Sequence, residues 1–206
     1  MPRSSRRTST PVATRGGGAD RPTHLARNVL LLLPAAVALW LAVAPVYNRM
    51  LVNGGELLLH LGESPNQTRV YLREGRYAMV VRHDVSGGQR FVAELTLADL
   101  HFNLILLVAL FLAPPGVPWA RRWRRLGLAA LAGLAFHLAL IVFRIESVYA
   151  LELGEWSARH YGPVARNFWG LGKHLLDLPL KLGLPLLLWA AFYLRLVLPA
   201  RPEAAA

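Results

Sequence analysis

The stretch LADLHFNLILLVALFLAPPGVPW, Leu97–Trp119, joins an apolar run to polar groups gathered at its beginning. Its first turns carry Asp99, His101 and Asn103, whereas the run that follows is apolar. Apolar side chains suit the hydrocarbon of a bilayer, but a buried imidazole or amide needs a hydrogen-bonding partner. We therefore expect a membrane helix over residues 99–117, whose polar end meets either neighbouring helices or a client.

Three further apolar blocks of similar length predict that the whole chain is a membrane protein. The chain has 206 residues, of which 54% are hydrophobic, and its mean hydropathy is +0.36. A helix needs about 20 apolar residues to cross the hydrocarbon. The predicted fold is a membrane all-α bundle of four transmembrane helices, over residues 28–47, 99–117, 126–148 and 180–198.

The first apolar block allows a second interpretation. A basic segment precedes it, and Ala42–Ala44 resembles the cleavage site of a signal peptide. The block is longer than the usual signal-peptide core of about 7–15 residues, which favours a retained helix.

The segment between the first two spans, residues 48–98, changes its hydrophobic period. Apolar and polar residues alternate in three runs, and Gly75 and the Ser86–Gly88 stretch separate these runs. Alternation with glycine-bearing turns is typical of antiparallel hairpins. We predict a small antiparallel β-meander in this first extracytoplasmic loop. Its strands are expected at Thr68–Glu74, Tyr77–His83 and Phe91–Leu97.

Such a sheet is stable only if its apolar face is covered. The membrane surface, the Leu57–Leu61 segment or a partner protein are the three candidates for this cover. Residues 48–63 are expected to form a short helix lying on the membrane, which Gly54 and Gly55 interrupt.

Arginines predict the orientation in the membrane. The tail 1–27 and the link 118–125 are basic and the C-terminal end carries Arg195 and Arg201, whereas most acids lie in the loops 48–98 and 149–179. Because positive segments remain in the cytoplasm, both termini are expected inside and both long loops outside a bacterial inner membrane. The tail is too polar to fold alone and is expected to be disordered. The net charge of +11 is attributed to this pattern, and no nucleic-acid partner is expected.

Eight polar residues within or near the spans form the candidate interaction site. Most lie at the predicted outer helix ends, and one histidine lies near the middle of the third span. They either pair with each other and with water at the interface, or bind a client or substrate. The central His137 is either a hydrogen-bonding bridge between helices or a proton or metal site. The candidates are Asn48, Arg49, Asp99, His101, Asn103, His137, Arg144 and Glu146.

Common catalytic and metal-binding patterns are missing from the sequence. It has no cysteine, no GxSxG, no HExxH and no glycine-rich phosphate loop. His101 and Asn103 diverge by about 200° on a straight helix and are not expected to chelate one ion. We therefore assign no catalytic residue, no metal and no cofactor, and we consider an enzyme less favoured than a non-enzymatic protein.

Three runs of the sequence resemble a small bacterial family. They are APVYNRML (Ala44–Leu51), HFNLILLVALFLAPPG (His101–Gly116) and AFHLALIVFR (Ala135–Arg144). These runs look like those of the membrane proteins associated with exosortase H in bacterial protein sorting. Exosortases are multi-spanning transpeptidase-like enzymes that use a cysteine, which this chain lacks. The resemblance implies an accessory role beside such an enzyme and supplies no catalytic residues.

Two hypotheses about function follow. In the first, the chain is a non-enzymatic inner-membrane accessory protein that contacts an exosortase, or its sorting-signal client, through the outer loops and polar helix ends. In the second, it is a lipid- or small-molecule-handling membrane enzyme or carrier that uses the polar cluster at the outer leaflet. Membrane lipid is an expected partner in both.

Overall fold

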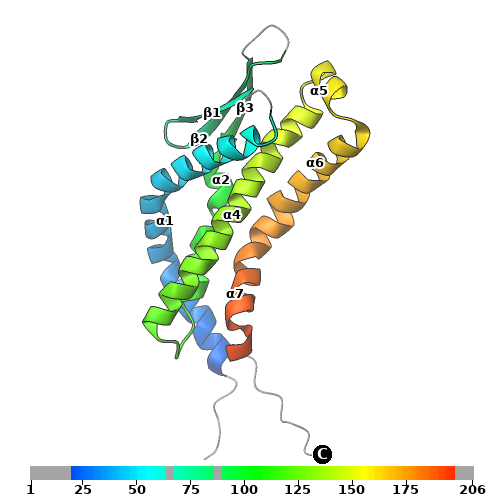
Figure 1. Cartoon of the computed structure of the whole chain (residues 1–206). Helices are drawn as coiled ribbons and strands as arrows, with labels where there is room; N and C mark the ends of the chain where they lie inside the picture. Colours follow the sequence, from blue (N-terminus) through cyan, green and yellow to red (C-terminus); the bar gives the residue numbers. More distant parts are fainter. Residues whose placement is uncertain (1–19, 64–66, 86–89, 198–206) are drawn as a thin grey trace, which may run out of the picture.

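A computed structural model describes residues 20–63, 67–85 and 90–197 and is mostly helical. Long helices run side by side along one axis, and the sheet and α5 lie at the end opposite to the start of α1 and the end of α7 (Figure 1). The helices are α1 (Asp20–His60), α2 (Leu97–His101), α3 (Leu104–Leu112), α4 (Trp119–Leu151), α5 (Glu155–His160), α6 (Pro163–Leu175), the π-helix η1 (Leu176–Leu180) and α7 (Lys181–Val197).

Three helices are long and apolar enough to cross a membrane, namely Thr23–His60, Trp119–Leu151 and Pro163–Leu194. The predicted second span is a shorter apolar segment, Leu97–Leu112, so four membrane-spanning helices are not confirmed. Strand β3 continues to Thr96 and α3 ends before the prolines, which leaves about 24 Å of helix where hydrocarbon is about 30 Å thick. This short segment is nevertheless central, because α3 contacts α1, α4 and α7.

The long helices extend beyond the predicted spans. Helix α1 begins at Asp20, so residues 20–27 are helical where a disordered tail was expected. Helix α4 includes the basic residues predicted as a link, and residues 149–179 contain α5, α6 and η1. Residues 1–19, the predicted second turn around Gly87 and residues 199–206 lie outside the described residues.

Gly54 and Gly55 do not interrupt α1, which corrects the sequence-based expectation. A Cβ atom at Gly54 would lie 2.7 Å from Leu138 Cδ2, and one at Gly55 would lie 3.0 Å from Ile141 Cγ2. The two glycines therefore let α1 pass close to α4. The packing gained at this crossing offsets the low helix propensity of glycine.

The three-stranded antiparallel sheet is confirmed, in the order β1-β2-β3. Val70 pairs with Val80, which pairs with Ala93, so the alternation places these side chains on one face. Glu74 and Gly75 both have positive φ, and the Arg76 amide donates to the Arg73 carbonyl. This tight turn suits the twist of a hairpin. The strands are β1 (Thr68–Arg73), β2 (Tyr77–Arg82) and β3 (Arg90–Thr96).

The chain itself covers the apolar face of the sheet. Ala78 and Val80 are fully buried in one cluster with residues of α1 and α4, including Leu59 and Ile145. Of the three predicted covers, the end of α1 therefore contributes, together with α4. Because α1 and α4 cover this face of the sheet, it does not need a partner protein as its cover.

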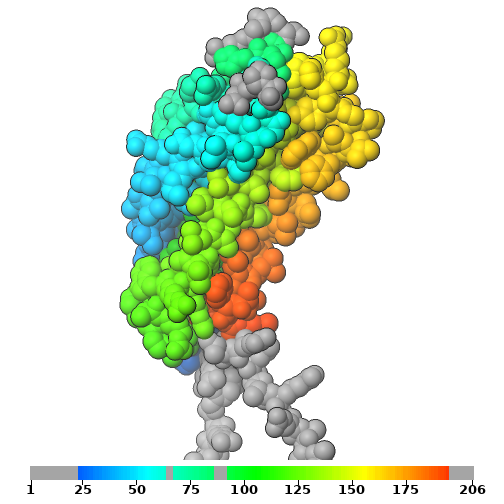
Figure 2. All heavy atoms as spheres, in the orientation of Figure 1, coloured from blue at the N-terminus to red at the C-terminus, as the bar shows by residue number. Residues whose placement is uncertain are grey.

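Helix α6 packs closely on α4 through another glycine. A Cβ atom at Gly172 would lie 2.2 Å from Phe143 Cε1. The Phe143 ring also packs against two rings of α6, Phe168 with centroids 5.5 Å apart and Trp169 at 4.8 Å. The ring has little freedom to move away. In Figure 2, α4 separates α1 on one side from α6 and α7 on the other.

Replacing Gly172 with alanine should lower the free energy of unfolding by about 1–3 kcal/mol, because the new methyl group meets a fixed aromatic ring. Gly127→Ala is the matched control, since a Cβ there has no neighbour within 4 Å. It should raise stability by up to about 1 kcal/mol through helix propensity. Denaturation in mixed micelles, followed by circular dichroism, measures both. Equal effects of the two substitutions would contradict the packing described.

Candidate functional site

A chain of hydrogen bonds runs from α1 through α2 to the sheet. Trp40 Nε1 lies 2.9 Å from His101 Nδ1, and His101 Nε2 lies 2.7 Å from Asn48 Oδ1. Asn48 Nδ2 donates to the Gly75 carbonyl at 2.7 Å. An indole only donates and a carbonyl only accepts, so these two ends determine every role between them. His101 is a neutral imidazole with its proton on Nε2. We call these four groups relay A.

A second chain with the same order of groups runs from α1 through α4 to α7. The Tyr47 hydroxyl lies 2.8 Å from His137 Nδ1, and His137 Nε2 lies 2.9 Å from Asn103 Oδ1. Asn103 Nδ2 donates to the Lys181 carbonyl at 2.8 Å. Because that carbonyl only accepts, Asn103 turns its oxygen to His137, which donates from Nε2. We call these four groups relay B.

A proline explains why the Lys181 carbonyl is available to relay B. In an α-helix this carbonyl would accept from the amide of the residue four positions later. That residue is Pro185, inside α7, and it has no amide hydrogen. Asn103 therefore supplies the donor that the helix cannot, as buried backbone in an apolar layer requires.

The interrupted helix between α2 and α3 brings both relays together. Residues 102 and 103 form a turn, so His101 and Asn103 are both buried while Phe102 points outward with 41% of its surface exposed. The rings of His101 and His137 have centroids 6.5 Å apart, and His137 is fully buried. Four of the eight predicted residues, from three parts of the chain, thus meet in one cluster.

The other four predicted residues lie elsewhere. Arg49 and Asp99 are exposed. Arg144 forms an ion pair with Asp177 of η1, which also accepts a hydrogen bond from Lys181 Nζ at 2.9 Å. Glu146 accepts a hydrogen bond from the Tyr161 hydroxyl at 2.7 Å. The partners of Arg144 and Glu146 thus come from the second loop and not from the other helix ends.

Sequence reasoning missed the two aromatic donors. Trp40 and Tyr47 are not among the eight candidates, because amphipathic aromatics toward the end of a membrane helix are common at the interface. Their spacing of seven, or about two helical turns, places them on one face of α1 beside Asn48 and was the available signal. Pro185 was a second signal, since a proline inside a helix leaves a carbonyl four residues earlier without its amide donor.

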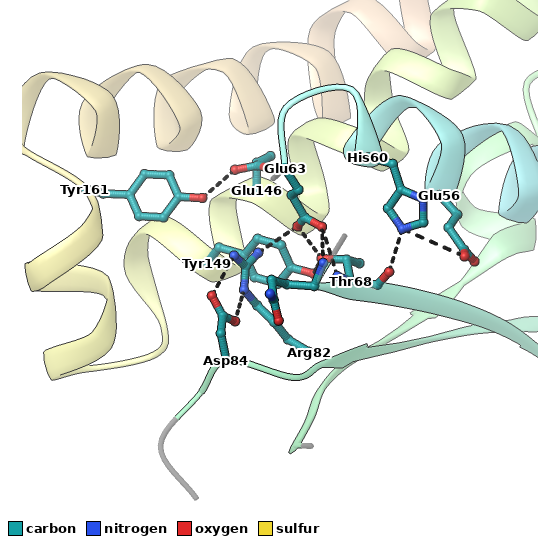
Figure 3. A network of polar contacts seen from close by, with 10 residues as sticks. Glu56, His60, Glu63, Thr68, Arg82, Asp84, Glu146, Tyr149 and Tyr161 are labelled. Atoms are coloured by element: carbon teal, nitrogen blue, oxygen red, sulfur yellow. Dashed lines mark hydrogen bonds and ion pairs between the residues drawn. The ribbon is translucent and has the colours of Figure 1, made fainter. Parts of the chain in front are cut away.

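A separate polar network joins the sheet to the end of α1 and to α4 (Figure 3). Arg82 Nη1 lies 2.9 Å from Glu63 Oε1, and Arg82 Nε lies 2.6 Å from Asp84 Oδ1. The guanidinium contacts the faces of two rings, 4.4 Å from the Tyr149 centroid and 4.6 Å from the Trp156 centroid. The second oxygen of Glu63 accepts from the amides of residues 67 and 68, so this carboxylate closes the loop into β1.

The network keeps Arg82 charged although it is buried. Burial disfavours the charged guanidinium, but the hydrogen bond and charge of Asp84, together with the charge of Glu63, raise the pKa of Arg82. Tyr161 behaves as a neutral donor, because burial and its hydrogen bond to Glu146 raise the pKa of this hydroxyl. Both groups are therefore structural ion-pair or hydrogen-bond partners at neutral pH.

The relays leave little scope for chemistry. Every side-chain nitrogen and oxygen of Asn48, His101, Asn103 and His137 has a partner within the chain. Among the described residues, no group of three or more His, Cys, Asp or Glu side chains is placed to hold a metal ion. No protein-family model, curated protein or solved structure matches this chain.

Stability measurements should distinguish the two relays. Asn48→Ala and His101→Ala should each lower the free energy of unfolding by at least about 1–3 kcal/mol, because each leaves buried polar atoms unpaired. The double variant should lose less than the sum, because both substitutions break relay A. Asn48→Ala with Asn103→Ala should be closer to additive, because no hydrogen bond joins the relays. A larger deviation from additivity for Asn48→Ala with Asn103→Ala than for Asn48→Ala with His101→Ala would contradict this arrangement.

The tautomers of both histidines should be visible by ¹⁵N NMR of histidine-labelled protein in micelles. We expect His101 and His137 to show an unprotonated Nδ1 and a protonated Nε2, since each Nδ1 accepts a hydrogen bond. Trp40→Phe removes the indole donor of relay A and should change the Nδ1 chemical shift of His101, with little change at His137. A doubly protonated imidazole at His101 at neutral pH would contradict relay A.

Proposed function

We propose that the chain is a non-enzymatic, multi-pass accessory protein of a bacterial inner membrane, with four membrane passes and both termini in the cytoplasm. The arginines at the start of α4 lie at the same end of the molecule as the start of α1, which agrees with the positive-inside rule. The short α2–α3 segment serves as the fourth pass, surrounded by the longer helices.

The observation that carries the proposal is an exposed apolar face on α6. Val164, Phe168 and Leu171 are 83%, 57% and 72% exposed, with the spacing of a helix-pairing seam. Helix α6 lies beside the end of α4, because a Cβ at Gly170 would be 3.1 Å from Leu151. If α4 enters the hydrocarbon at Leu126, it has crossed the full thickness of about 30 Å near Glu146. Phe168 packs on Phe143 of α4, with ring centroids 5.5 Å apart, so this face of α6 lies at the outer edge of the hydrocarbon.

An exposed apolar face at this level, where the bilayer hydrocarbon ends, suits contact with another membrane protein. The partner contact thus moves from the covered sheet to α6 in the second outer loop. The saturated relays support a structural role and weigh against the enzyme or carrier hypothesis, which needs a free polar group. The link to an exosortase-type sorting enzyme rests on the resemblance of the three sequence runs.

Co-purification of the tagged protein from its native membrane tests this proposal, with partners identified by mass spectrometry. Wild-type protein should retain an exosortase or a sorting-signal protein, and Leu171→Lys should reduce that yield at least about fivefold through burial of an unpaired charge. Leu61→Lys is the control, because Leu61 is also at the outer end and 78% exposed. Recovery of the protein without any sorting component would overturn the accessory proposal.

A further inference from the structure

Two hollows follow one face of α1 at the basic end of the molecule. The lower one, of about 270 Å³, is bordered by Asn28 of α1, Leu112 of α3 and Arg122 of α4. The upper one, of about 190 Å³, is bordered by Val43 of α1 and Ala130 of α4, and its lining is entirely apolar or aromatic. Spacings of three, four and seven residues put the lining side chains on the same face of each helix. The two hollows therefore lie in line along the contact of α1 with α3 and α4, which we call the seam.

The dimensions of the seam suit one lipid chain. Arg122, which borders the lower hollow, and Ala130, which borders the upper one, are separated by about 12 Å along α4, at 1.5 Å per residue. One leaflet supplies about half of the 30 Å hydrocarbon thickness. A chain that starts at the lower hollow thus reaches the upper one. Trp40, which borders the upper hollow, is held in place by its hydrogen bond to His101.

The charge at the lower hollow favours an anion. Arg27 and Arg121, each next in sequence to a lining residue, are exposed, and no carboxylate partner is found for them in the part of the chain that the structure describes. Arg122 is held by two hydrogen bonds, from Nη1 to the Leu112 carbonyl at 2.5 Å and from Nε to a second carbonyl at 2.9 Å. Its Nη2 amino group is left for a ligand, and a guanidinium held in this way suits a phosphate.

We propose that this seam binds one anionic phospholipid, with its phosphate at Arg122 and an acyl chain in the upper hollow. The proposal rests on the membrane location proposed above but not on the sorting partner. The apolar lining selects an acyl chain, and the unpaired arginines select a negative headgroup over a zwitterionic one. A soluble phosphate would use only the lower hollow.

Native mass spectrometry of the protein in dodecyl maltoside, with added phosphatidylglycerol or phosphatidylcholine, tests the site. Wild-type protein should retain one phosphatidylglycerol with roughly tenfold preference over phosphatidylcholine, because both lipids carry the phosphate but the arginines repel the choline ammonium. Arg122→Gln, which removes the guanidinium that borders the hollow, should remove most of this preference, whereas Arg124→Gln, which changes an exposed arginine that does not line the hollow, should retain most of it. Ala130→Trp fills the upper hollow and should abolish retention without changing the charge.

Leu131→Trp is the control for the filled hollow, because Leu131 is 65% exposed and does not line it. If Arg122→Gln disturbs the turn before α4, the Ala130→Trp and Leu131→Trp pair still tests the site. Equal retention of both lipids, equal loss in both arginine variants, or no effect of Ala130→Trp would overturn the proposal. Binding of inorganic phosphate that Ala130→Trp leaves intact, without lipid retention, would also overturn it. None of these results depends on recovery of a sorting enzyme.

Discussion

Polar groups buried between apolar helices must find partners within the protein, because hydrocarbon supplies none. This requirement determines how α1, α2, α4 and α7 meet. Asn48 and Asn103 each turn their oxygen to a histidine and their amino group to a backbone carbonyl. Because a backbone carbonyl only accepts, neither asparagine can exchange the places of its oxygen and its amino group. A shift of one helix by one residue would leave several buried groups unpaired, at about 1–3 kcal/mol each.

Close helix contacts bring these groups within bonding distance. Gly54 and Gly55 let α1 approach α4, and Gly172 does the same for α6. The sheet then packs on the part of α1 and α4 that extends past the relays, and Asn48 ties its first turn to the helices. The small sheet is therefore part of the same core as the helices and not a separate domain.

Much of this architecture is predictable from local patterns. The alternation around Gly75 predicts the sheet, and polar residues inside apolar runs predict that Asn48, His101, Asn103 and His137 lie inside. The pairing of these residues is less predictable, because it depends on the turn at residues 102–103 and on which carbonyl is free. The glycines of α1 were misjudged for a similar reason, since helix propensity does not include a close neighbour such as Leu138.

The ends of the two relays have a consequence for the membrane itself. A proton moves along hydrogen-bonded groups only if each group can both accept one proton and release another. The Trp40 indole has no free lone pair to accept a proton, and the carbonyls of Gly75 and Lys181 have none to release. The backbone carbonyl at the end of each relay therefore blocks proton transfer along that relay. Two imidazoles thus lie within an apolar layer without offering a route that would discharge a proton gradient.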